Sequence, residues 1–178
     1  GTTAVAYTQA VAGLTPGATY YFCAIGSNSV GTSFGALLSF TALAAAPTVT
    51  TAAATGVTTT TATLNGSANP NGDPTTGWFR IDTVSPGTCN DTFGTRVPAS
   101  TGAALGSGNA AVAFSQTAPA IAPGTTYYYC AIAQNSVGTG VGSVRTFTTP
   151  APPTVNTLAA TPVTAVSATL NASANPHG

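Results

Sequence analysis

The chain has 178 residues, of which only 3% are charged, against about 25% in an average soluble domain. Three Arg and three Asp give a formal net charge of zero. A neutral chain lacks the basic surface that binds nucleic acid or anionic lipid. One His, three scattered Asp and three Cys offer little for acid–base catalysis or metal binding. We therefore expect no enzyme activity, no cofactor, no metal site and no nucleic-acid partner.

Apolar residues make up 43% of the chain, but 20 Gly and 13 Pro interrupt them repeatedly. Such turn residues disfavour long helices. The longest run of low polarity covers residues 36–46, which is much shorter than the about 20 residues of a membrane-spanning helix. We expect no membrane insertion.

The chain matches itself over most of its length. Residues 1–41 match residues 108–148 at a spacing of 107 positions, and residues 47–72 match residues 153–178 at a spacing of 106. A repeat of this length has the size of a domain, so the sequence predicts consecutive domains in a window of a longer tandem protein. We expect the end of one domain at 1–43, a complete domain at 47–149 and the beginning of a third at 153–178.

Within the complete repeat, short segments rich in Val, Thr, Tyr and Phe alternate with turn residues, a pattern typical of an antiparallel β-sandwich. Asn69-Pro-Asn-Gly72 suits a tight turn, because Asn and Gly adopt left-handed backbone conformations. Residues 84–107 are expected to form one long loop. The expected strands are 48–53, 59–67, 76–83, 110–118, 125–134 and 143–149.

Two segments carry a family resemblance. Ile121-Ala-Pro-Gly-Thr-Thr-Tyr127 and its copy Leu14-Thr-Pro-Gly-Ala-Thr-Tyr20 resemble the tyrosine corner that begins the sixth strand of fibronectin type III domains. The Tyr-Tyr-Cys-Ala-Ile-Ala-Gln-Asn-Ser-Val-Gly that follows Tyr127 resembles the F strand and F–G loop of that family. The resemblance implies an all-β chain of tandem, fibronectin type III-like antiparallel sandwiches, in which the hydroxyls of Tyr20 and Tyr127 bind backbone a few residues upstream.

The sequence departs from that family in two ways. The second expected strand lacks the usual core Trp, and cysteines are present. Both features resemble bacterial surface variants that carry L-N-G-x-x-N-P-N-G followed by W-F.

The cysteine positions predict a disulfide on the outside of the sandwich. In immunoglobulin domains the corner Tyr precedes the core Cys by two residues, so both share a face. Tyr127 and Cys130 are three residues apart, which puts Cys130 on the outer face. Its candidate partner within the domain is Cys89, whose loop would then fold back over the sheet. That loop would cover Trp78, Tyr128 and Ile132.

Cys23 is the repeat equivalent of Cys130, and we expect it to form a disulfide with a residue outside the chain. Three unpaired cysteines remain the alternative. For Trp78, burial under the loop is favoured over an exposed surface that binds sugar or a neighbouring domain. Ion pairs of Asp82 with Arg80 or Arg145 are also expected.

Three Asn-x-Ser/Thr triplets permit glycosylation, although such triplets also arise by chance in a chain rich in Thr and Ser. They begin at Asn65, Asn90 and Asn171.

Together these features favour a structural role outside the cell. We expect an extracellular or cell-surface protein that forms a stalk, filament or sheath by self-association, because a neutral surface tolerates dense packing. Two alternatives stay open: a spacer or carbohydrate-binding module of a secreted enzyme, and the stalk of a host-cell adhesin.

Overall fold

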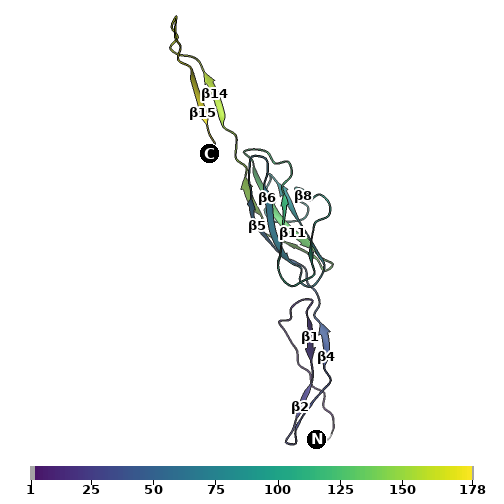
Figure 1. Ribbon diagram of the computed structural model, residues 1–178. Helices are drawn as coiled ribbons and strands as arrows, with labels where there is room; N and C mark the ends of the chain where they lie inside the picture. Colours follow the sequence, from purple (N-terminus) through teal and green to yellow (C-terminus); the bar gives the residue numbers. More distant parts are fainter. Residues whose placement is uncertain (1–2, 178) are drawn as a thin grey trace.

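The computed structural model describes residues 3–177, and every regular element in this range except isolated bridges and turns is a β-strand. Figure 1 shows an elongated molecule in which three sections follow one another. The N-terminal section contains β1 to β4, the middle section β5 to β13, and the C-terminal section β14 and β15.

The two outer sections are built from antiparallel pairs. In the N-terminal section β1 pairs with β4 and β2 with β3, and in the C-terminal section β14 pairs with β15. Their bounds are β1 Thr19–Phe22, β2 Ile25–Ser27, β3 Thr32–Phe34, β4 Leu38–Thr41, β14 Thr154–Leu158 and β15 Asn171–Asn175.

The middle section consists of two antiparallel sheets. The first has the order β10-β6-β5, with β5 Thr48–Thr55, β6 Thr63–Asn69 and β10 Val112–Thr117. The second has the order β12-β11-β7-β8, while β13 also pairs with β11 and β9 with β7. Its bounds are β7 Thr75–Asp82, β8 Thr95–Val97, β9 Ala103–Gly106, β11 Thr126–Gln134, β12 Thr139–Val141 and β13 Arg145–Thr148.

A hydrophobic core lies between these sheets, which gives the middle section a sandwich-like architecture. Leu64 from the first sheet and Phe79 and Tyr129 from the second are fully buried. A Cβ atom on Gly66 would lie only 2.7 Å from the Cβ of Ala131, so the close approach of the sheets requires a glycine there. The alternation of buried and half-buried residues along β6 fits a strand with one face in the core.

The expected strands are present with shifted ends, and two expectations are wrong. The second strand begins at Thr63 rather than at 59, because Thr58 and Thr61 close a turn through their hydroxyls, 2.7 Å apart. The expected loop 84–107 contains β8 and β9, which add to the free side of β7. Both strands are too short for the alternation of apolar and polar residues that marks a strand to be recognised in the sequence.

Candidate functional site

The predicted disulfide between Cys89 and Cys130 is confirmed, with 6.0 Å between the two Cα atoms. Cys130 lies on the face of β11 that points away from the main core, where its side chain is fully buried. The chain after β7 therefore folds back over the outer face of the second sheet. The bond fixes a segment that has little secondary structure of its own.

A second, smaller core forms under this segment. Trp78 and Ile132 pack with Cys130, and Cys89 and Phe93 cover them from the loop side. Trp78 is 3% exposed, which confirms the predicted burial. Tyr128, which was also expected under the loop, is only half-buried and lies outside this cluster.

Charged side chains surround the Trp78 ring. The carboxylate of Asp91 accepts hydrogen bonds from Trp78 Nε1 at 2.8 Å and from Arg80 Nε at 2.9 Å. The guanidinium carbon of Arg96 lies 4.2 Å from the centre of the indole ring, a cation–π arrangement. These contacts attach the loop to the sheet by polar as well as apolar interactions.

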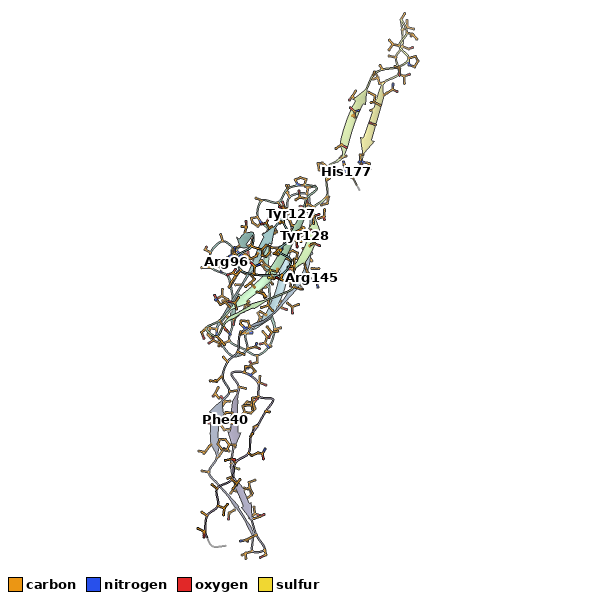
Figure 2. The ribbon with its side chains drawn as sticks, turned by 180° about the vertical axis from the view of Figure 1, so that it is seen from behind. Phe40, Arg96, Tyr127, Tyr128, Arg145 and His177 are labelled. Atoms are coloured by element: carbon orange, nitrogen blue, oxygen red, sulfur yellow. A yellow bond between two sulfur atoms is a disulfide. The ribbon has the colours of Figure 1, made fainter. Side chains whose placement is uncertain are left out.

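The ion pairs expected for Asp82 are wrong. Its carboxylate instead accepts the backbone N–H groups of Thr83 and Val84 and so caps the turn after β7. Arg145 Nε donates to the carbonyl of Thr51 at 2.8 Å. Figure 2 shows Arg96 and Arg145 in the middle section, and all six charged residues lie between positions 73 and 145.

The two corner tyrosines make the same backbone contact. The hydroxyl of Tyr127 accepts a hydrogen bond from the N–H of Ala122 at 2.8 Å, and that of Tyr20 accepts one from Thr15 at 2.7 Å. Each ring stacks on a phenylalanine, and for Tyr20 this is Phe40, which Figure 2 labels. Hydrogen bonding by Thr15 lowers the pKa of Tyr20 from its ordinary value.

The junction between the N-terminal and middle sections is held by two asparagines. Asn71 Nδ2 donates to the carbonyl of Ala46 at 2.7 Å and to the hydroxyl of Thr48 at 3.1 Å. Asn135 Nδ2 donates to the carbonyls of Ala45 at 2.8 Å and Pro70 at 3.1 Å. The linker is thus fixed to two loops of the middle section. Sequence reasoning used Asn71 only as a turn residue and gave Asn135 no role.

Backbone packs directly on backbone at this junction. A Cβ atom on Gly72 would lie 2.5 Å from the Cα of Gly17, and both glycines have positive φ, 90° and 70°. Any side chain at either position would separate the two sections.

The junction before the C-terminal section has related contacts. Gly124 N donates to the carbonyl of Pro150 at 3.1 Å, as Gly17 N does to that of Leu43 at 3.3 Å. His177 takes the place of Asn71: it has φ 52°, and its Nε2 lies 3.2 Å from the hydroxyl of Thr154.

The three glycosylation triplets lie in different surroundings. Asn65 and Asn171 use their amide nitrogens to bind the carbonyls of Ala53 and Ala159, each at 2.9 Å. At Asn65 this bond replaces ladder pairs lost where the register of β5 and β6 shifts. Asn90 is exposed in the loop, and its Oδ1 accepts the hydroxyl of Thr92 at 2.8 Å. Glycosylation itself stays a prediction.

Cys23 is exposed and forms no disulfide within residues 3–177, so its partner outside the chain also stays a prediction. In the same range, no helix is long and apolar enough to cross a membrane. Nor do three or more His, Cys, Asp or Glu residues of the described chain gather as they would around a metal ion.

No protein-family model matches the chain, and no curated protein matches it. Among solved structures it is similar to the sensor domain of the anti-sigma factor RsgI4 from Pseudobacteroides cellulosolvens, in a short and a long form. The short form shares 17% identity at a TM-score of 0.42 and covers 59% of this chain and 95% of its own. The long form shares 17% identity at a TM-score of 0.39, with coverage of 59% and 90%.

Proposed function

We propose that the chain is part of an extracellular, fibronectin type III-like tandem protein that forms a stalk, filament or sheath at a microbial surface by self-association. The observation that carries this proposal is the junction built by Asn71 and Asn135. Side chains that bind the linker limit rotation of one section against the next, as a stalk requires. A flexible tether would leave the linker carbonyls to water.

The distribution of charge supports self-association that does not depend on the salt concentration. The N-terminal and C-terminal sections contain no Arg, Lys, Asp or Glu. In the middle section Arg80 and Asp91 form an ion pair, and Asp82 and Asp73 accept backbone N–H groups. Copies therefore approach one another with little long-range repulsion.

The disulfide supports an oxidising environment. A bridge that holds a loop over a small second core persists in secreted and surface-exposed proteins, whereas cytosolic thiols are kept reduced. This agrees with a position outside the cell.

Sedimentation and electron microscopy at about 0.05 M and 0.5 M salt test the proposal, since the Debye length changes severalfold over this range. We expect the protein to associate equally at both concentrations. A variant with Thr59→Lys, Ser107→Lys and Ser143→Lys provides the control. All three positions are exposed, and the added charges should prevent association at low salt only.

Dispersed monomers of the wild-type protein in both buffers would contradict self-association. Assemblies that dissolve at 0.5 M salt, in the range where screening is strong, would contradict the neutral-surface argument.

A further inference from the structure

Strand β10 has a free edge. It pairs only with β6, while β9, which precedes it in the chain, pairs with β7. Ala118 N donates to the carbonyl of Ala62 at 2.8 Å, which continues the ladder of β10 toward β6. Backbone groups alternate sides along a strand, so Ala113, Ser115 and Thr117 direct theirs away from β6.

These outward backbone groups have no partner. Among residues 3–177, β10 pairs with no strand other than β6, and no side-chain or loop hydrogen bond involves the N–H or C=O groups of Ala113, Ser115 and Thr117. The three residues are exposed. An exposed edge of this kind is a template for another strand.

The edge of β5 in the same sheet is protected. Arg145 Nε donates to the carbonyl of Thr51 at 2.8 Å, and the hydroxyl of Tyr129 donates to that of Ala52 at 2.6 Å. Natural sheets protect their edges with such capping groups, with charges or with proline.

In the second sheet, β8 has only three residues, contains Arg96 and is followed by Pro98. By contrast, residues 109–118 contain neither a charge nor a proline. In the first sheet the unprotected edge is therefore that of β10.

We propose that the β10 edge binds the β10 edge of a second copy of this chain, antiparallel, around a two-fold axis at Ser115. This inference rests on the proposed self-association and names its contact surface. The three outward residues are symmetric about Ser115, so Ser115 faces Ser115 of the partner and Ala113 faces Thr117. Each such pair exchanges two hydrogen bonds, which gives about six in total. The first sheets of the two copies then form one continuous sheet.

The side chains fit this arrangement. Ala, Ser and Thr are small and uncharged, so no like charges face each other across the axis. Phe114 is buried in the core of its own copy, and its backbone N–H and C=O groups point toward β6. If the two β10 strands shifted by one residue against each other, these groups would stand opposite the outward groups of the partner and could not pair with them.

One strand pair buries less than the about 1,000 Å² typical of a stable interface, so the contact is weak by itself. Repetition along an array increases the strength of binding. Residues 5–10, Val-Ala-Tyr-Thr-Gln-Ala, match Val112-Ala-Phe-Ser-Gln-Thr117 in sequence at a spacing of 107 and are also uncharged, although they form no strand in this structure.

Sedimentation equilibrium of the whole chain at about 0.5 M salt tests the contact, because long-range repulsion is screened there. Ser115→Lys places two ammonium groups at the axis and should raise the dissociation constant about tenfold or more. Ser143→Lys adds the same charge at an exposed serine outside β10 and should associate as the wild type does.

Hydrogen exchange of the wild-type protein gives an independent result. The amides of Ala113, Ser115 and Thr117 should exchange freely in dilute solution and become protected as the protein associates. This measurement decides the matter even if Ser115→Lys does not fold.

If the wild type associates while these amides stay open, or while Ser115→Lys associates equally well, the β10 contact is wrong but the proposed function stands. If the wild type stays monomeric up to millimolar concentration, both are wrong.

Discussion

Replacement of Asn135 by alanine tests the junction most directly. Its side chain is 9% exposed and makes four hydrogen bonds. Nδ2 binds the carbonyls of Ala45 and Pro70, and Oδ1 accepts the N–H groups of Val137 and Gly138 at 3.0 and 3.1 Å. One side chain therefore joins the linker, the turn before β7 and the loop after β11.

The expected cost follows from these four bonds. Each is worth about 0.5–1.5 kcal/mol net, and a buried group left without a partner costs about 1–3 kcal/mol. Water can reach some of the freed groups, so Asn135→Ala should lower the free energy of unfolding by about 2–4 kcal/mol.

Asn28 is the matched control, because it occupies the equivalent position 107 residues earlier. Its Oδ1 accepts the N–H groups of Val30 and Gly31 at 2.9 and 3.1 Å, but its Nδ2 donates to no described residue and the side chain is exposed. Denaturant unfolding followed by tryptophan fluorescence separates the two variants. The chain has one Trp, Trp78, so the signal reports on the middle section.

Asn135→Ala should shift the fluorescence midpoint to lower denaturant, and Asn28→Ala should leave it unchanged. Equal shifts in the two variants, or an unchanged midpoint for Asn135→Ala, would refute the reasoning. Small-angle scattering should also show a broader range of maximum dimensions for Asn135→Ala than for Asn28→Ala.

Three further predictions follow from the disulfide and the tyrosines. Cys89→Ser opens a loop with a sequence separation of 41 and should lower stability by about 2–4 kcal/mol, with a red shift of tryptophan emission; an unchanged midpoint would contradict it. Tyr127→Phe should cost about 1 kcal/mol by denaturant unfolding, while Tyr20→Phe, at the exposed corner, should leave the fluorescence midpoint unchanged. Burial raises the pKa of Tyr129 above its ordinary value of 10.0, so stability should be constant below about pH 10 and fall above it, because the unfolded chain ionises first. Tyr129→Phe should weaken this fall, and an identical pH profile would exclude Tyr129 as its source.

The sequence predicted those features that depend on local chemistry or on the two faces of a strand. Spacing from Tyr127 was enough to place Cys130 on the outer face, and the loop expected to fold back over that face was enough to bury Trp78. The turn at Asn71 followed from the preference of Asn for a left-handed backbone, and its φ is 55°.

Features that depend on contacts distant in the sequence were not predictable in the same way. Strands β8 and β9 form because β7 offers a free side, and nothing within three or four residues indicates this. Asp91 rather than Asp82 pairs with Arg80, because the disulfide brings the loop back across the sheet. The bonds of Asn135 span 65 and 90 positions of the chain, beyond the reach of any local pattern.

The junction, the strand bulge and the free edge share one feature. At each of them the chain has uncharged polar side chains instead of charged ones. Asn amides bind the linker and the bulge through directional hydrogen bonds, which salt does not screen. A chain with so few charges has none at the β10 edge: Arg145 protects the edge of β5, and Arg96 lies on the Trp78 ring. Strand β10 is left without a protecting charge, and the neutrality that keeps copies from repelling one another also leaves this edge open to them.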